Sequence, residues 1–235
     1  MNISDRIIVA LDVASRARAL EYVKDLMPLA NFFKVGSQLF TACGPDLVRD
    51  IVQLGARVFL DLKFHDIPQT VANSVLEAAR LHVTMINVHS SGGMKMLQAA
   101  ARALAEHSGG TERPRLIAVT MLTSIGETDA REIGFSLPLA HQSVRLAHMA
   151  KRAGLDGVVA SPLEIELIRQ DCGKDFLIVT PGIRLAQSGA DDQVRISTPK
   201  ATLDAGADYL VIGRPIFEAE DPLQALQNIV ESVKS

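Results

Sequence analysis

Two lysines and two aspartates are spaced in this sequence so that they could act together on one reacting carbon. Asp61 and Lys63 are two residues apart in an apolar run, so on a regular strand both side chains leave the same face. Lys34 on the preceding expected strand and Asp66 just past the strand end complete an alternating lysine–aspartate set. Buried charges must be paired. The set is therefore either a salt-bridge network or an array that holds an ammonium beside a carboxylate at the reacting carbon, and we favour the array.

A second group of residues has the chemistry of an anion site. Residues 180–184 read Thr-Pro-Gly-Ile-Arg, and Gly213-Arg214-Pro215 follows the last expected strand. Glycine allows close backbone approach, arginine offers a bidentate charge, and proline suits the first turn of a short helix. The alternative is a pair of surface arginines beside tight turns. We expect the segment with Pro181 and Arg184 to bind phosphate together with Gly213 and Arg214.

Eight short apolar runs, rich in β-branched residues, alternate with helical patterns. Such runs are typical of parallel strands that are covered on both faces. Each strand–helix unit takes about 29 residues, the size of a βαβ repeat, and eight of them predict an α/β protein, a single-domain (β/α)8 TIM barrel over residues 1–235. An open doubly wound sheet is the alternative, but no GxGxxG motif follows the first run. The expected strands are 7–11, 32–35, 58–62, 85–88, 116–121, 157–160, 176–179 and 209–212.

The expected helices lie between these runs. Ser15 suits the N-cap of the first, and Gly44-Pro45 suits the start of the second. A long polar loop is expected over 184–195. The expected helices are 15–29, 44–54, 71–81, 94–107, 139–152, 163–170, 199–205 and 223–233.

Polar residues stand at the C-terminal ends of many expected strands, which form the active-site face of a barrel. Asp12 ends the first strand, His89 ends the fourth, and the fifth leads to Thr123. Each has an ordinary structural reading as well. A strand-end aspartate commonly caps a helix, and for His89 we favour a satisfied side chain under a loop. The repetition over so many strands is what indicates a functional face.

Composition limits the partners. The chain has 24 Lys+Arg and 27 Asp+Glu, a net charge of −3, which gives no electrostatic case for nucleic acid or an anionic membrane. Cys43 and Cys172 have no metal-ligand or CxxC spacing and fit a reducing compartment. The apolar run 7–11 is too short for a signal-peptide core, and no run approaches the length of a membrane span. We expect a cytoplasmic protein.

Residues 61–70 carry a resemblance to a known family. Asp61-x-Lys63-x-x-Asp66-Ile67-Pro68-x-Thr70 resembles the signature of orotidine 5′-phosphate decarboxylases. Gln69 stands where that family often has Asn, and Leu185 replaces a common Pro. Further motifs follow in the family's order, namely Leu11-Asp12, Lys34-Val35-Gly36, residues 119–124, residues 180–184, Asp192-Gln193-x-Arg195 and Gly213-Arg214.

The resemblance implies removal of CO2 from orotidine 5′-monophosphate to give uridine 5′-monophosphate, a step of de novo pyrimidine biosynthesis. Lys63 would protonate C6 of the pyrimidine, and Asp61 would lie against the substrate carboxylate. In a homodimer, Asp66, Ile67 and Thr70 would reach the partner's site. The other implied contacts are Asp12 and Lys34 with the ribose, Thr123 with the pyrimidine edge, Gln193 over the substrate, and Pro181, Arg184, Gly213 and Arg214 around the phosphate.

The sequence has no motif for pyridoxal phosphate, thiamine or a metal, so we expect a cofactor-free reaction. An ammonium at Lys63 would then stabilise the developing carbanion. One alternative is a Mg2+-dependent enzyme like 3-keto-L-gulonate 6-phosphate decarboxylase, which is similar around Asp-x-Lys-x-x-Asp but is disfavoured by the Ile-Pro-x-Thr continuation. Another is a non-catalytic phosphate-binding barrel, in which Asp61 and Lys63 merely pair.

Overall fold

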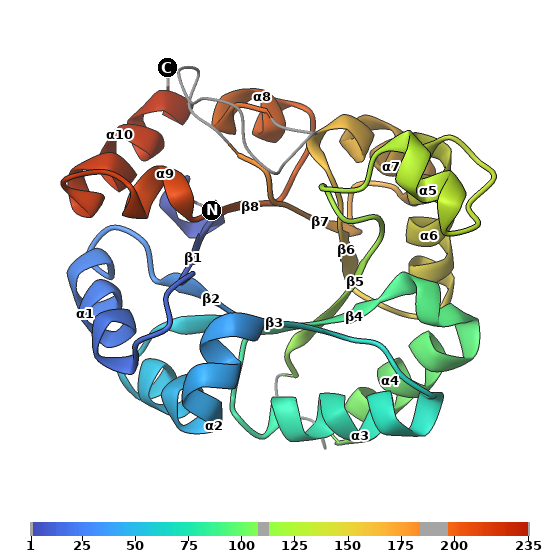
Figure 1. Cartoon of the computed structure of the whole chain (residues 1–235), viewed down its shortest axis with the longest axis horizontal. Helices are drawn as coiled ribbons and strands as arrows, with labels where there is room; N and C mark the ends of the chain where they lie inside the picture. The colour runs from blue at the N-terminus through green and yellow to red at the C-terminus, as the bar shows by residue number, and fades with distance from the viewer. Residues whose placement is uncertain (1, 108–112, 184–196, 235) are drawn as a thin grey trace.

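Eight parallel strands close into a barrel in the computed structural model of the chain (Figure 1), which describes residues 2–107, 113–183 and 197–234. The strands pair in chain order, and β8 pairs with β1 to complete the ring. The predicted (β/α)8 barrel is confirmed, and the open sheet is excluded because no edge remains. The strands are β1 (Ile7–Ala10), β2 (Phe32–Gly36), β3 (Arg57–Phe64), β4 (Met85–His89), β5 (Arg115–Val119), β6 (Gly157–Val159), β7 (Leu177–Thr180) and β8 (Tyr209–Ile212).

Helices surround this ring on the outside (Figure 1). The Ser15 hydroxyl accepts a hydrogen bond from the Arg18 backbone N–H, which confirms Ser15 as the N-cap of α1. None of the helices among the described residues is long and apolar enough to cross a membrane. The helices are α1 (Arg16–Leu26), α2 (Ser37–Gln53), α3 (Pro68–Ala79), α4 (Gly93–His107), α5 (Glu127–Glu132), α6 (Leu139–Arg152), α7 (Ile165–Cys172), α8 (Pro199–Asp204), α9 (Arg214–Phe217) and α10 (Pro222–Lys234), with short 3-10 turns at Ser4–Arg6, Ser90–Gly92 and Pro162–Glu164.

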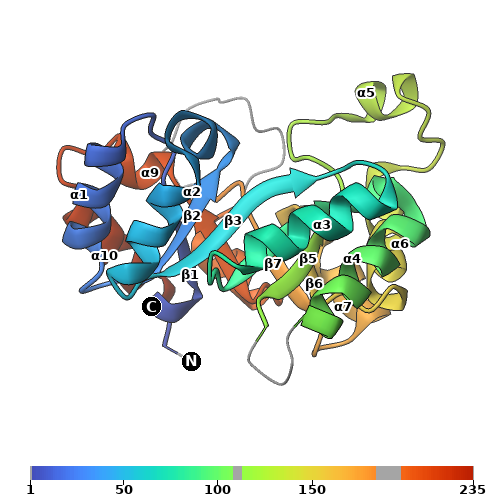
Figure 2. The same ribbon diagram turned by 90° about the horizontal axis from the view of Figure 1, so that it is seen from below.

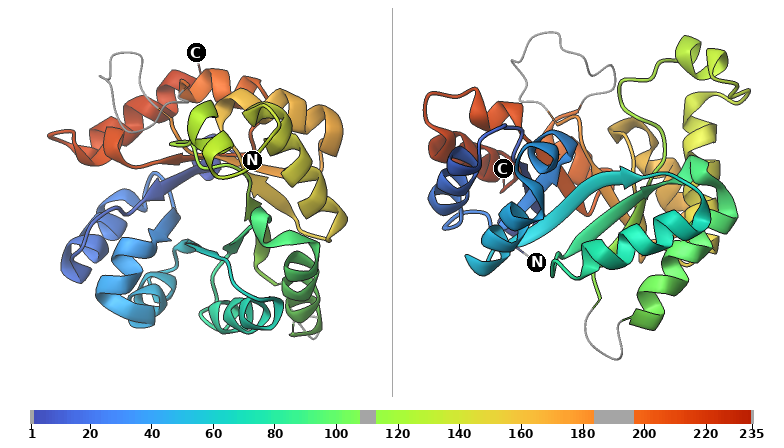
Figure 3. Two further views of the ribbon diagram at one scale, coloured as in Figure 1. Left: turned by 45° about the vertical axis from the view of Figure 1, so that its right-hand side comes forward. Right: turned by 60° about the horizontal axis from the view of Figure 1, so that its bottom comes forward.

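Two helices differ from expectation. Helix α2 begins at Ser37, seven residues before the expected start at 44, because a first helical piece precedes a kink at Gly44 (φ 68°) and Pro45. A Gly-Pro pair looks like a helix start in sequence, so this first piece was not predicted. Helix α5 was also not predicted. It projects from the rest of the molecule beyond the ring of helices (Figures 2 and 3), and its N-terminus is capped by Asp129, which accepts from the Gly126 backbone N–H at 3.1 Å.

Apolar side chains fill both faces of the barrel wall, as the continuous apolar runs predict. Alternate strand residues enter the barrel, and the intervening residues pack against the helices in a second, larger cluster. Both clusters are almost free of solvent exposure. The inner cluster contains Ile8, Ala10, Phe32, Phe59, Met85, Ile117, Val179 and Val211.

Strand β3 contains a bulge close to its C-terminal end. Leu60 pairs with Ile86 and Phe64 pairs with Val88, so β3 uses four residues where β4 uses two. Lys63 lies inside this stretch with φ 52°, a left-handed conformation that costs a residue with a side chain roughly 1–2 kcal/mol. The expectation of a regular strand from Asp61 to Lys63 is therefore wrong, because the backbone is bulged there.

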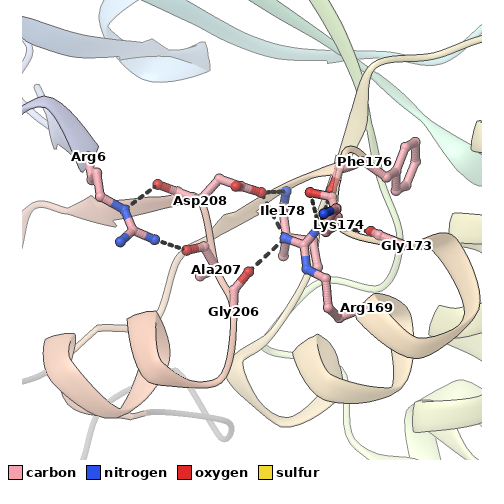
Figure 4. A network of polar contacts seen from close by, with 9 residues as sticks. All are labelled: Arg6, Arg169, Gly173, Lys174, Phe176, Ile178, Gly206, Ala207 and Asp208. Carbon is pink, nitrogen blue, oxygen red and sulfur yellow. Dashed lines mark hydrogen bonds and ion pairs between the residues drawn. The ribbon is translucent and has the colours of Figure 1, made fainter. Parts of the chain in front are cut away.

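A hydrogen-bond network ties β7 and β8 together at the other end of the barrel (Figure 4). One nitrogen of the Arg169 guanidinium donates to three backbone carbonyls at 2.7–3.1 Å, those of Gly173, Lys174 and Phe176. The other donates to the Gly206 carbonyl at 2.6 Å and to the Asp208 carboxylate at 2.8 Å. Arg169 thus satisfies carbonyls from both chain segments that enter these strands.

The Asp208 carboxylate also accepts from the Ile178 backbone N–H at 2.7 Å. Arg6, close to the N-terminus, also belongs to this network, since its guanidinium donates to the Ala207 and Asp208 carbonyls. The start of the chain is therefore fixed to the loop that precedes its last strand.

We expect Arg169→Lys to lower the free energy of unfolding by about 2 kcal/mol, and the melting temperature by several degrees, because one ammonium cannot span both groups of carbonyls. Thermal melts followed by circular dichroism measure this change. The matched control is Arg49→Lys, which alters an exposed pair with Asp46 on α2 and leaves melting unchanged. Equal melting of the Arg169→Lys protein and the parent would contradict a structural role for the network.

Candidate active site

A cavity of about 230 Å³ opens at the C-terminal ends of the strands. Apolar side chains from inside the barrel form part of its wall, among them Phe59 and Val211. Many of the predicted site residues meet there, although they come from distant parts of the chain. Those that line the cavity are Asp12, Lys34, Asp61, Lys63, Thr123, Pro181, Gly213 and Arg214.

The Asp61 carboxylate joins two lysines at this cavity. One oxygen, Oδ1, lies 2.7 Å from the Lys63 ammonium, and the other, Oδ2, lies 3.6 Å from the Lys34 ammonium. Lys34 also contacts Asp12 Oδ1 at 3.1 Å. The predicted closeness of Lys34, Asp61 and Lys63 is thus present in the structure, although Lys63 lies in the β3 bulge rather than on a regular strand.

Asp61 is ionised in this setting. Burial raises the pKa of its carboxyl, but the Lys34 and Lys63 ammonium groups, together with hydrogen bonds from Lys63 and Asn87, outweigh burial and leave the pKa below its ordinary value. Asp61 is only 8% exposed, so the charge is held inside the protein. A buried carboxylate beside an ammonium is consistent with both expected readings, the salt-bridge network and the charge array.

Asn87 on β4 belongs to the same network and was not predicted. Its side-chain amide donates to Asp61 Oδ1 at 2.6 Å, and its carbonyl oxygen accepts the Lys63 backbone N–H at 2.8 Å. The side chain is fully buried. One sequence signal could have identified it, since an amide inside an otherwise apolar strand needs a polar partner.

The Gly213 backbone lies close to the Asp12 side chain. A β-carbon at this position would lie 2.9 Å from Asp12 Oδ2 and 3.2 Å from the Ala10 β-carbon. A larger residue would therefore displace Asp12 or the end of β8. The absence of a side chain lets the backbone at the start of α9 approach the cavity closely.

The predicted anion site is only partly described. Gly182, with φ 79°, and Pro181 line the cavity next to Gly213 and Arg214. Pro215 lies in the first turn of the short helix α9, as expected. Two further predicted residues, Arg184 and Gln193, lie outside the described ranges.

Asp66, Ile67 and Thr70 do not line this cavity. All three are exposed, and Asp66 Oδ1 accepts the Ile67 backbone N–H at 2.6 Å. Asp66 therefore does not complete the lysine–aspartate set within this chain. The second acid that contacts Lys34 is Asp12 instead, at 3.1 Å.

His89 has the structural role that we favoured. Its Nδ1 accepts the Ser91 backbone N–H at 3.3 Å, and its ring stacks on His65 with centroids 5.3 Å apart. Burial, with smaller effects of His65 and Lys63, lowers the pKa of His89 to about 4. The ring is therefore neutral near pH 7.

The described ranges contain no group of three or more His, Cys, Asp or Glu side chains arranged to hold a metal ion. The groups at the cavity that could take part in a reaction are fixed charges. An ammonium, a buried carboxylate and an arginine surround one small cavity, an arrangement that suits a small anionic substrate.

Comparison with known proteins agrees with this geometry. Residues 5–229 match the family model described as Orotidine 5'-phosphate decarboxylase / HUMPS family. Proteins named orotidine 5'-phosphate decarboxylase from Geobacter sp. (strain M21) and Syntrophotalea carbinolica are 52% and 53% identical, over 97% of this chain and 95% and 94% of theirs.

Solved structures give the same result. The crystal structure of orotidine 5'-phosphate decarboxylase from Lactobacillus acidophilus has a TM-score of 0.85 and 39% identity, covering 98% of this chain and 100% of its own. An uncharacterised conserved protein from Geobacillus kaustophilus also has a TM-score of 0.85, with 37% identity over 97% of this chain and 99% of its own. By sequence and by structure, this chain belongs to the orotidine 5′-phosphate decarboxylase / HUMPS family.

Proposed function

We propose that this chain is an orotidine 5′-phosphate decarboxylase, which converts orotidine 5′-monophosphate to uridine 5′-monophosphate and CO2. The observation that carries the proposal is the Lys63 ammonium, held 2.7 Å from the buried Asp61 carboxylate at a cavity that Arg214 also lines. The names of relatives that are about half identical over nearly the full chain support the same activity.

Fixed charge can carry out this reaction. The bond between C6 of the pyrimidine and the carboxylate carbon breaks, and its electron pair stays on C6 while CO2 leaves. The Lys63 ammonium stabilises this pair and then gives its proton to C6, so that a C–H bond forms and a neutral amine remains. A proton taken up from the solvent then restores the ammonium. Asp61 holds Lys63 in place before the reaction and faces the departing carboxylate.

The remaining cavity residues have proposed binding roles. Asp12 and Lys34 bind the ribose hydroxyls, and Thr123 binds the pyrimidine edge. The phosphate lies between the Pro181 segment and Arg214, far from the reacting carbon. Its binding energy can still assist the reaction by ordering the site around the base. The roles proposed from the family for further residues are phosphate binding by Arg184 and Gly213 and closure over the substrate by Gln193.

We further propose a homodimer with shared active sites. Asp66, Ile67 and Thr70 lie exposed just beyond β3, and Ile67 is 67% exposed. Burial of such an exposed apolar side chain against a partner lowers the free energy. In the proposed dimer these residues reach the site of the partner, which would explain why Asp66 has no place at its own barrel mouth.

The whole chain, residues 1–235, forms one catalytic domain in this proposal, because pairing of β1 with β8 joins both ends of the chain to one sheet. The expected cytoplasmic location remains a prediction.

We expect Lys63→Ala to lower kcat at least about 10⁴-fold, since the variant loses both the proton donor and the charge at C6. The decrease in substrate absorbance measures turnover, and a thermal melt checks the fold. Lys24→Ala, which removes an exposed lysine on α1, is the control and keeps full activity. A Lys63→Ala protein with more than a few per cent of the parent's kcat would contradict the assignment.

The same assay in excess EDTA distinguishes the Mg2+-dependent alternative, for which activity would be lost. A non-catalytic phosphate-binding barrel would give a different result. The parent and the Lys63→Ala protein would then both bind the nucleotide, and neither would turn it over.

We expect Arg214→Ala to raise KM for orotidine 5′-monophosphate by about 10- to 100-fold, because a charge-assisted contact with the phosphate is lost. The phosphate-free nucleoside orotidine is the matched substrate, and its kcat/KM should change little. Equal losses with both substrates would mean that Arg214 supports the fold rather than the phosphate.

The shared site predicts complementation between two inactive proteins. When Lys63→Ala and Asp66→Ala subunits exchange at equal concentration, half of the dimers are mixed, and one site of each mixed dimer has both intact residues. Roughly a quarter of the parent's activity should return. The control pairs Lys63→Ala with Asp61→Ala, two defects of the same barrel mouth, which should not complement. No recovery despite proven exchange would assign Asp66 to its own barrel.

A further inference from the structure

Asn87 touches both halves of the charge pair without lining the cavity. Its amide nitrogen donates to Asp61 Oδ1 at 2.6 Å, and its oxygen accepts the Lys63 backbone N–H at 2.8 Å. The side chain is 0% exposed. Asn87 therefore cannot contact a substrate in the cavity, and any effect on chemistry must pass through Asp61 and Lys63.

Only one orientation of the Asn87 amide satisfies this site. Asp61 is ionised and accepts hydrogen bonds only, whereas the Lys63 backbone N–H only donates. A rotated amide would place its oxygen against the carboxylate and its NH2 against the N–H group, and both contacts would be repulsive. The two neighbours thus fix the amide, and the amide in turn fixes the two neighbours.

The β3 bulge explains why a side chain is needed here. Because β3 and β4 lose their regular register between Leu60 and Phe64, the Lys63 N–H bonds to a side chain instead of a β4 carbonyl. Lys63 also has φ 52°, a conformation that its surroundings must maintain. Without Asn87 a buried N–H would lose its acceptor, and the bulge would rearrange to find another.

We propose that Asn87 is a positioning residue that places the Lys63 ammonium for proton transfer by holding the β3 bulge and the Asp61 carboxylate together. This inference rests on the proposed function, in which Lys63 is the proton donor. Asp61 Oδ1 accepts from both Lys63 and Asn87, so its plane is fixed and Oδ2 remains directed to Lys34. A small displacement of a reacting group can cost about 100-fold in rate.

Two variants test the proposal. Asn87→Leu removes both hydrogen bonds at similar volume, and we expect kcat to fall about 100-fold with KM within about threefold of the parent. Asn87→Asp keeps the shape and an acceptor for the Lys63 N–H, but its ionised form cannot donate to Asp61.

The pH dependence of Asn87→Asp gives a readout that a purely structural role would not produce. When protonated, the introduced acid donates to Asp61 and restores both bonds, so the activity relative to the parent should rise as pH falls from about 8 to 5. The charged groups near this position are Asp61 and Lys63 on β3 and, through Asp61, Lys34 on β2. The adjoining β5 residue is the apolar Ile117, and His89 is neutral in this range.

Ile86→Val is the matched control. Ile86 lies one position earlier on β4, is fully buried and packs toward the helices, so this variant should melt a few degrees lower with unchanged kcat. The proposal is overturned if both Asn87 variants keep kcat within threefold of the parent. A loss confined to KM, or a pH-independent activity ratio for Asn87→Asp, overturns it as well.

A crystal structure of Asn87→Leu separates this inference from the proposed function. If the parent does not decarboxylate orotidine 5′-monophosphate, the proposed function fails, and the structure alone decides the positioning claim. We expect the distance from Lys63 Nζ to Asp61 Oδ1 to exceed about 4 Å, the limit of an ion pair. An unchanged Lys63 in that crystal would show that Asn87 does not position it.

Discussion

The buried negative charge of Asp61 allows two lysine ammonium groups to enter the mouth of the barrel. Lys34 and Lys63 would otherwise repel each other and lose hydration without compensation. Asp61 remains ionised at low exposure because both lysines and the Asn87 amide surround it. The barrel wall provides this setting, since β2, β3 and β4 are adjacent and deliver their side chains to the same opening.

The barrel could be predicted from sequence because its determinants are local. Eight apolar runs require cover on both faces, and their number and spacing suit a closed ring. The bulge in β3 could not be predicted, since the sequence Arg57–Phe64 has the pattern of a regular strand. The extra residues become apparent only when β3 is aligned with its partner β4. Helix α5 could not be predicted from the sequence either. It spans only Glu127–Glu132, too short to show an amphipathic period.

The meeting of several candidate site residues could be predicted where polar residues stand at strand ends. Asp12, Lys34, Asp61 and Lys63 meet because parallel strands bring their C-terminal ends to one face. Asn87 was missed because its importance depends on two partners that lie 24 and 26 residues away in sequence. The position of Asp66 could not follow from the charge pattern, because that pattern does not show that Asp66 is exposed and lies outside the cavity.

Closure of the ring by β1 and β8 also sets the order of events during synthesis. Roughly 200 residues separate the two strands, so at ordinary ribosomal speeds β1 waits about 10–40 s for its last partner. Throughout this interval one edge of the growing sheet has unpaired backbone groups that another nascent chain could bind. The four-residue length of β1 limits that exposed edge, and the Arg6 contacts to Ala207 and Asp208 form only when the end of the chain arrives.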